Sequence, residues 1–282
     1  MGQKDKTEKI LMDYNDIFSD IINVLLFDGD RRVDPDSLES AGALSQYKAD
    51  DGVIHQQERD VTKNWNGNGI RIATFGIENQ SEDERDLVFR VLSYDGASYR
   101  SQLLSDRKER TPVATIVLYF GSDHWNAPRT LKELVKIPEE LDKFINDYRI
   151  NVFEISWLTE EQVSMFQSDF GVVADFFVKK RLDPDYIPAD KRVIKHVDEV
   201  MKLLAVMTGD DRYEKVLQEE GKEDIQTMCD VAERLEKRGY DNGYEKGRQE
   251  ERIIIFKELV KKGVYTPEQA EKESGISAND LV

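Results

Sequence analysis

Two acidic residues and one amide flank a strong turn signal, and together they suggest a metal site. Asp60 lies near the start of the segment RDVTKNW, and Glu78 and Gln80 lie at the end of IRIATFGIENQ. Between them runs Asn66–Gly69, a doubled Asn-Gly sequence typical of a tight β-hairpin turn. Residues two apart on a strand share a face, so Glu78 and Gln80 point the same way, and the hairpin brings Asp60 close to Glu78. Two carboxylates at one sheet edge supply the oxygen ligands that Mg²⁺ prefers, and a metal there activates water and shields a phosphate.

The alternative is that these acids are solvated charges beside a turn, which is common. The rest of the sequence offers few competing sites. His55, His124 and His196 are scattered without zinc-like spacing. The single cysteine, Cys229, excludes a disulfide scaffold and fits a reducing, cytoplasmic compartment. No glycine-rich phosphate-binding motif is present, so the sequence gives no sign of a nucleotide cofactor.

Composition limits the classes of protein that the chain can represent. The chain has 282 residues, and 57 acidic against 40 basic side chains give a net charge of −17. The length suits one core domain and an extension, and no apolar stretch reaches the ~20 residues of a membrane helix. Strong acidity argues against binding DNA in bulk. Residues 85–110 run the other way, with six Lys and Arg against four acids.

Hydrophobic periodicity places this hairpin among other elements. It predicts a helix over 7–27, then mostly loop over 28–57 with a short helix at 36–47, and the hairpin at 58–80. A helix over 83–104 and a buried strand from Pro112 to 121 are predicted next. A strand at 150–158 follows, and the chain is predicted to be helical from there to about 262. Thr159 and Gln162 have the spacing of a capping box. The pattern is that of an α/β protein with a mixed sheet and a helical C-terminal arm. It divides into a core over 1–180, a helical extension over 181–238 and a tail over 239–282.

The tail is predicted to join copies of the chain. Gly239, Gly243 and Gly247 recur every four residues, which favours either a helix that packs closely on a partner or a flexible hinge. The helix is preferred, because Ile254 and Ile255 then begin an apolar stripe in need of a partner. Thr266-Pro267-Glu268-Gln269 is a strong helix start. Its helix-turn-helix outline is too short at its C-terminal end for a full recognition helix.

Several segments, in this order, resemble a known family. They are EKILMDYNDIFSDIINVLLF, QERDVTKNW, FGIENQ, FRVLSYDGASYRSQL, PVATIVLYFGSDHW, RGYDNGYEKGRQEE and LVKKGVYTPEQAEKESGIS. The chain resembles the bacterial recombination-promoting nuclease / putative transposase family, within the PD-(D/E)XK nuclease superfamily. The resemblance implies a restriction-endonuclease-like core and metal-dependent DNA cleavage in recombination, transposition or defence.

The resemblance also implies roles for the hairpin residues. Asp60 and Glu78 would bind Mg²⁺ or Mn²⁺, with the carbonyl of Asn79 as a further ligand. Gln80 would stand where the wider superfamily places a lysine, as is common in this family. Gln is neutral, so it orients water or phosphate by hydrogen bonds and supplies no charge. Reduced catalysis is therefore an open alternative.

Other polar residues are expected to assist or to be merely solvated. Lys63 would supply charge if it reached the site, although on an ideal strand it points away from Asp60. Asp16 and Asp20 share a face of the first helix and resemble acids that assist metal binding in some related nucleases. Gln102 is a polar candidate in the helix after Gln80. Arg85, Arg90 and Arg100 are candidate phosphate contacts or solvated positions.

Two functions follow from these expectations. The first is a metal-dependent DNA endonuclease that binds DNA weakly and in a salt-sensitive way. The second is a catalytically degenerate scaffold of the same fold, which oligomerises through its C-terminal helices. The neutral Gln80 and the strong acidity favour the second.

Overall fold

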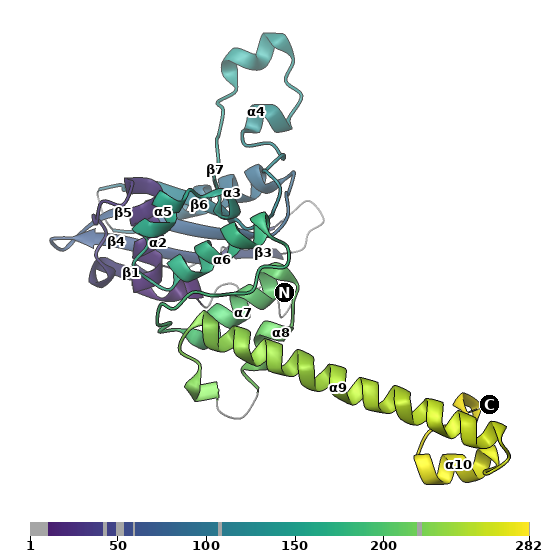
Figure 1. Ribbon diagram of the computed structural model, residues 1–282. Coiled ribbons are helices and arrows are strands. Elements are labelled where there is room, and N and C mark those ends of the chain that lie inside the picture. The colour runs from purple at the N-terminus through teal and green to yellow at the C-terminus, as the bar shows by residue number, and fades with distance from the viewer. Residues whose placement is uncertain are drawn as a thin grey trace. The chain divides into compact units, whose positions relative to one another are not determined.

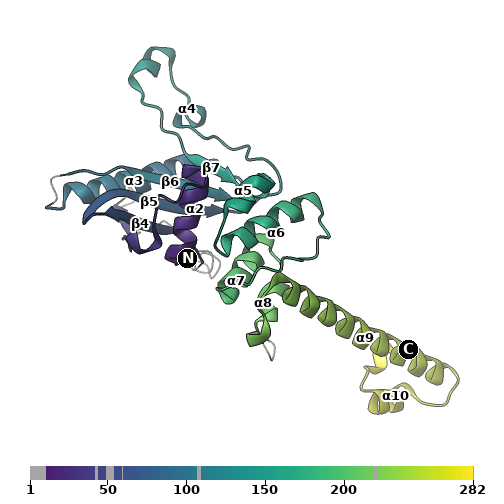
Figure 2. The same cartoon turned by 60° about the vertical axis from the view of Figure 1, so that its left-hand side comes forward.

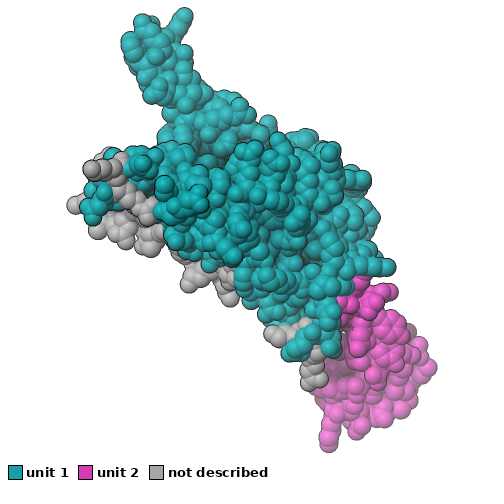
Figure 3. Space-filling model, turned by 90° about the vertical axis from the view of Figure 1, so that its left-hand side faces the viewer, with its two compact units in different colours: residues 1–228 teal, residues 229–282 magenta. Residues whose placement is uncertain are grey.

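The computed structural model describes residues 11–41, 44–48, 54–58, 60–106, 109–218 and 222–281, with the backbone alone at 44–48, 54–58 and 222. Contacts divide the chain into two units, Met1–Met228 and Cys229–Val282, which Figure 3 colours separately. Within the first unit, the boundary after residue 180 stays a prediction.

A five-stranded sheet forms the centre of the first unit (Figure 1), with the order β1-β4-β5-β6-β7. The strands are β1 Leu38–Ser40, β4 Val61–Gly67, β5 Ile70–Gln80, β6 Val113–Tyr119 and β7 Asn151–Glu154. β4 is antiparallel to both β1 and β5, whereas β5, β6 and β7 are parallel to one another. A separate pair, β2 Leu44–Lys48 and β3 Ile54–Glu58, is antiparallel. The predicted α/β fold with a mixed sheet is confirmed, and it is consistent with a restriction-endonuclease-like core.

The predicted hairpin is β4 and β5, and its turn uses the second Asn-Gly pair. Asn68 and Gly69 both have positive φ, 51° and 76°, which is what a two-residue hairpin turn of the favoured hand requires. Val61 pairs with Ile77, and Gly67 pairs with Ile70. Along β5, Ile70 and Ile72 near the turn are exposed, whereas every residue from Ala73 to Asn79 is buried, so this part of the strand is covered on both faces.

Helices cover both faces of the sheet (Figures 1 and 2). The helices of the first unit are α2 Asn15–Phe27, α3 Leu87–Leu103, α4 Leu131–Leu134, α5 Glu160–Met165, α6 Phe170–Leu182, α7 Val197–Thr208 and α8 Arg212–Val216. On one face, Phe18 of α2 lies under the Lys63 ammonium, and Phe170 of α6 contacts Phe120 just after β6. On the other face, Val91 of α3 packs in a buried cluster with Val117 of β6. β6 is buried on both sides, as predicted for a parallel strand.

Two predictions for the N-terminal region need correction. The helix expected over 7–27 is interrupted at Tyr14, whose extended backbone (ψ 130°) precedes α2, and its first residues lie outside the described range. The loop expected over 28–57, with a helix at 36–47, contains the short η1 helix Pro35–Ser37 and the strands β1, β2 and β3. β1 lies at the edge of the sheet and pairs with β4 on one side. Polar side chains are common on edge strands, which is why this segment has the composition of a loop.

The capping motifs in the sequence correctly predict where two helices begin. The Thr159–Gln162 capping box is present at the start of α5, and Thr266 caps α10, Pro267–Ser274, in the second unit. The other helix of that unit, α9, is 34 residues long, Met228–Lys261, and runs through Gly239, Gly243 and Gly247. The glycine repeat is therefore helical, and the packing of this helix on a second chain stays a prediction. No helix among the described residues is both long and apolar enough to cross a membrane.

Candidate functional site

Asp60 and Glu78 are neighbours across the β4–β5 hairpin. The Val61–Ile77 pairing continues by one residue to place Asp60 opposite Glu78. The Asp60 amide lies 3.5 Å from Glu78 Oε2, and the Asn79 amide donates a 2.8 Å hydrogen bond to Asp60 Oδ2. Glu78 and Asn79 are each 4% exposed. The structure therefore brings together the two carboxylates that the sequence pattern paired.

Arg90 of α3 is the cation beside this pair. Its Nη2 donates a 2.7 Å hydrogen bond to Glu78 Oε1, and its Nη1 donates a 2.8 Å bond to Glu84 Oε2. Burial alone would lower the pKa of Arg90, but the negative charges of Glu78, Glu84 and Asp60 raise it. The guanidinium thus stays charged and neutralises part of the carboxylate cluster.

The donor set suits a hard divalent cation. Carboxylate oxygens from two strands are ligands that Mg²⁺ accepts, and Mg²⁺ commonly keeps several waters in its remaining positions. Among the described residues no group of three or more His, Cys, Asp and Glu side chains has metal-binding geometry. Asp60 and Glu78 would supply two ligands to a mostly hydrated ion, with the Asn79 carbonyl as the candidate third ligand. Because Arg90 holds Glu78 Oε1, an ion that uses this oxygen must displace the guanidinium.

Gln80 lies two residues beyond Glu78 on the same face of β5 and is half-buried. It is level with Tyr119 of β6, which in turn is level with Glu154 of β7. The predicted shared face of Glu78 and Gln80 is thus present at the carboxyl end of the parallel strands. This is the end of an open α/β sheet where ligands usually bind.

Lys63 lies on the opposite face of β4 from Asp60. It is 1% exposed, and its Nζ donates hydrogen bonds to the Asp13 carbonyl (2.6 Å) and to Asn15 Oδ1 (2.7 Å). The ammonium fastens β4 to the start of α2. The structure does not bring it to the Asp60–Glu78 pair.

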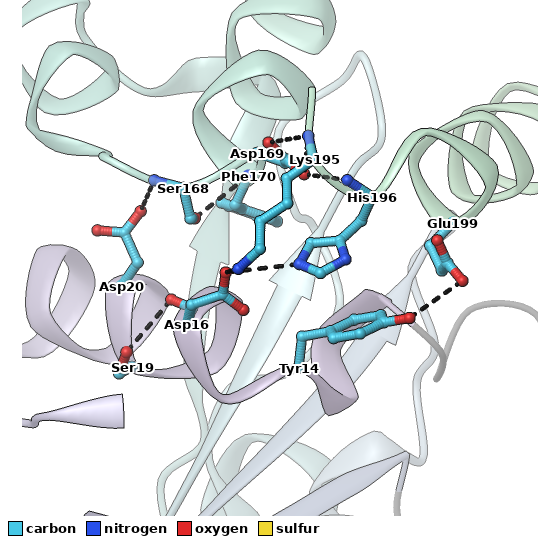
Figure 4. Close-up of polar contacts among 10 residues, drawn as sticks. All are labelled: Tyr14, Asp16, Ser19, Asp20, Ser168, Asp169, Phe170, Lys195, His196 and Glu199. Atoms are coloured by element: carbon cyan, nitrogen blue, oxygen red, sulfur yellow. Dashed lines mark hydrogen bonds and ion pairs between the residues drawn. The ribbon is translucent and has the colours of Figure 1, made fainter. Parts of the chain in front are cut away.

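Asp16 and Asp20 of α2 form hydrogen bonds with the residues just before α7 and just before α6, respectively (Figure 4). Asp16 Oδ2 accepts from Lys195 Nζ at 2.8 Å and lies 3.4 Å from the His196 ring. Asp20 Oδ2 accepts from the amides of Gln167 and Ser168 at 2.9 and 2.7 Å. Both acids line a cavity of about 350 Å³ beside α2. They hold α2 to its neighbours and are not brought to the pair on β4 and β5.

Gln102 and the remaining arginines lie apart from the pair. Gln102 exchanges hydrogen bonds with Thr111: its Nε2 donates to the carbonyl at 3.0 Å, and its Oε1 accepts from the amide at 2.8 Å. Thr111 precedes β6, so this contact lies at the end of the sheet opposite Glu78. Arg85 lies just before α3 and is exposed, as is Arg100 in the last turn of that helix. Only Arg90 of the three predicted phosphate contacts borders the carboxylates.

Sequence reasoning missed a polar cluster at the end of β7. Glu154 accepts hydrogen bonds from His124 Nδ1 (2.6 Å), the Trp125 amide (3.2 Å) and Arg129 Nη2 (2.5 Å). Burial would raise the pKa of Glu154, but these hydrogen bonds and charges lower it. The His124 ring also stacks on Trp157 at 3.6 Å between centroids. The strand predicted over 150–158 has Glu154 in its middle, whereas β7 ends at Glu154 and the short η3 helix Ile155–Trp157 follows, so no sequence pattern marks Glu154 as a strand end.

The fold and the paired carboxylates define an α/β protein with a restriction-endonuclease-like core and an acidic site at the carboxyl end of its parallel strands. Residues 73–211 match the family model described as "Putative transposase, YhgA-like", and this part of the chain belongs to that family. The resemblance inferred from the sequence is thereby confirmed over this range. The match includes Glu78 and Gln80, whereas Asp60 lies before its first residue. No curated protein and no solved structure gave a significant match.

Proposed function

We propose that the chain is a Mg²⁺- or Mn²⁺-dependent DNA endonuclease that hydrolyses phosphodiester bonds in recombination, transposition or defence. The observation that supports this most is the Asp60–Glu78 pair, which combines cross-strand contact, the burial of Glu78 and hard oxygen donors. Membership of residues 73–211 in a transposase family points to the same class of chemistry.

The proposed reaction needs three tasks from the chain. Asp60 and Glu78 hold the ion, which when bound supplies Lewis-acid activation of the phosphate and of the attacking water. Gln80 orients that water or a phosphate oxygen through its amide, as a neutral donor and acceptor. Arg90 offers a guanidinium fork to the phosphate.

The test is cleavage of supercoiled plasmid by pure protein with Mg²⁺ or Mn²⁺. Asp60→Asn and Glu78→Gln should each lower the rate by more than the ~10–100-fold typical of losing an outer-sphere partner of a metal. Asp142→Asn removes one exposed carboxylate from a pair with Lys132 and should leave the rate unchanged. Cleavage that is equal in all four proteins, or independent of metal, would reveal a contaminating nuclease and refute the proposal.

DNA binding is proposed to be weak and sensitive to salt. Arg85 and Arg100 are exposed in a chain with net charge −17, so few phosphates can be neutralised at once. The logarithm of the binding constant falls with the logarithm of salt concentration by about 0.9 per phosphate contact. A slope magnitude near 2–3, measured by fluorescence anisotropy on a short duplex, is expected from two or three arginine contacts.

We also propose that α9 and α10 join two copies of the chain. α9 exposes Tyr240 (72%), Tyr244 (57%), Ile254 (61%) and Ile255 (49%). Added Cβ atoms at Gly239, Gly243 and Gly247 would meet nothing in this chain, so a second helix has room to approach. Light scattering should give a dimer or a larger oligomer for the wild type and a monomer for the double variant Ile254→Lys/Ile255→Lys. A monomeric wild type at tens of micromolar would refute this assignment.

A further inference from the structure

Arg90 occupies the electrostatic position that a metal ion would take. Its Nη2 lies 2.7 Å from Glu78 Oε1, and its Nη1 lies 2.8 Å from Glu84 Oε2. Asp60 is close enough to contribute to the same field. A guanidinium held among carboxylates satisfies their charge without any ion.

The guanidinium and a divalent ion compete for Glu78. Glu78 Oε1 accepts from Arg90 Nη2 at 2.7 Å, so an ion that binds through this oxygen, alone or together with Oε2, meets the guanidinium. Two cations cannot share one buried carboxylate oxygen without strong repulsion, because the Glu78 side chain is only 5% exposed and water screens the charges poorly. Metal binding through Glu78 Oε1 therefore requires that Nη2 leave Glu78.

The two carboxylates that bind Arg90 differ in solvent exposure. The Glu84 side chain is 39% exposed, against 5% for Glu78, and Arg90 itself is 29% exposed. A guanidinium that turns outward can keep Glu84 and release Glu78. Moreover, Arg90 Nε is buried without a hydrogen-bond partner among the described residues, so the inward position leaves one donor unsatisfied. A phosphate at the mouth of the site would receive the freed N–H groups as a fork.

We infer that Arg90 is a built-in counter-ion that withholds Glu78 from the metal until a nucleic-acid phosphate draws the guanidinium outward. This inference rests on the proposed metal-dependent activity and concerns the regulation of the same site. Metal and DNA then bind cooperatively, because each favours the outward position of Arg90. Linkage requires that DNA raise the metal affinity by the same factor by which the metal raises the DNA affinity.

The experiment is a titration of the full chain with Mn²⁺, read by electron paramagnetic resonance of the free ion. It is done without DNA and with a phosphorothioate duplex, which keeps its charge and resists cleavage. The duplex alone is titrated to subtract its own Mn²⁺ binding. The expected coupling lies in the ~5–150-fold range of allosteric pairs.

Three variants separate the counter-ion from general electrostatics. Arg90→Gln should bind Mn²⁺ at least about 5-fold more tightly than the wild type without DNA, and DNA should no longer raise its affinity. Glu84→Gln removes the outer partner of Arg90 and should weaken Mn²⁺ binding, the opposite direction. Arg212→Gln breaks an exposed pair with Asp210 for the same change in charge and should match the wild type.

The possible failures are distinguishable. If Mn²⁺ binds equally to the wild type and to folded Arg90→Gln, the counter-ion inference is refuted and the nuclease proposal survives. If neither protein binds Mn²⁺, with or without DNA, the metal-dependent function fails and the inference fails with it. If Arg90→Gln does not fold, Glu84→Gln decides the question, because unchanged or tighter Mn²⁺ binding there contradicts the counter-ion role.

Discussion

The buried ammonium of Lys63 donates a 2.7 Å hydrogen bond to Asn15 Oδ1 at the start of α2. It also donates to the Asp13 carbonyl at 2.6 Å and lies 5.7 Å from the Phe18 ring centroid. At β4, Asp60 therefore supplies a carboxylate to the candidate site on one face of the sheet, and Lys63 holds the start of α2 on the other. The nearest lysine in sequence to Asp60 serves the fold and not the site.

Lys63→Met should lower the free energy of unfolding by about 1–3 kcal/mol, because the Asp13 and Asn15 oxygens lose their donor while the apolar volume is kept. Urea unfolding followed by tryptophan fluorescence measures this change. Lys132→Met, which breaks an exposed pair with Asp142, should change stability by no more than ~1 kcal/mol. Equal loss in both variants would contradict the structural role of Lys63.

Asp60 can be separated into a structural and a chemical contribution. Asp60→Asn keeps an oxygen that accepts from the Asn79 amide, so stability should change by no more than ~0.5 kcal/mol. Asp60→Ala removes that acceptor and should cost about 1–2 kcal/mol. Both variants should lose metal-dependent cleavage. An Asn variant that cleaves like the wild type would show that the carboxylate charge is not needed.

Asp20→Ala should destabilise the fold by about 1–3 kcal/mol, because the part-buried hydrogen bonds from the amides of Gln167 and Ser168 lose a charged acceptor. Asp20→Asn should lower the free energy of unfolding by less than Asp20→Ala does, because its Oδ1 can still accept from the same two amides. Its NH₂ group then faces the Arg31 guanidinium. Thermal unfolding of the three proteins gives the order. If the Ala variant were as stable as the wild type, the contact between α2 and the residues before α6 would not matter for folding.

The Asp16 contacts predict a dependence of stability on pH. Burial would raise the pKa of Asp16, but hydrogen bonds and charges from Lys195 and His196 lower it below its ordinary value of 3.8. A carboxyl with a lowered folded-state pKa contributes stability above its unfolded-state pKa and loses it as pH falls through the folded-state value. The pair is partly exposed, so its contribution at pH 7 should be under ~1 kcal/mol.

Asp16→Asn measures this contribution. The wild type should be the more stable protein near pH 7, and the difference should start to shrink near pH 3.8, the ordinary pKa of the carboxyl, and be lost once the pH has fallen through the lowered folded-state pKa of Asp16. Urea midpoints at several pH values give the comparison. A difference that grows on acidification would have the wrong sign for this pair.

Local patterns in the sequence were sufficient for the hairpin and the helix caps. Asn68 and Gly69 accept positive φ at little cost, and the two-residue turn that they form pairs Gly67 with Ile70. A β-bulge between Trp65 and Asn66 then shifts this register by one residue, and this shift places Asp60 opposite Glu78. The capping box at Thr159 is likewise local, because its hydrogen bonds span three residues.

Only the tertiary structure decided which long side chains meet this pair. Arg90 reaches Glu78 because α3 packs on that face of the sheet, and Lys63 meets Asn15 because α2 packs on the other. No local pattern distinguishes Arg90 from Arg85 or Arg100, since a charged side chain on a helix is solvated until a neighbouring element covers it. The sequence by itself determined the hairpin that brings Asp60 close to Glu78, because turn chemistry is local. The folded structure decided the bulge that aligns the two residues and, through the packing of α3 on the sheet, the cation that neutralises them.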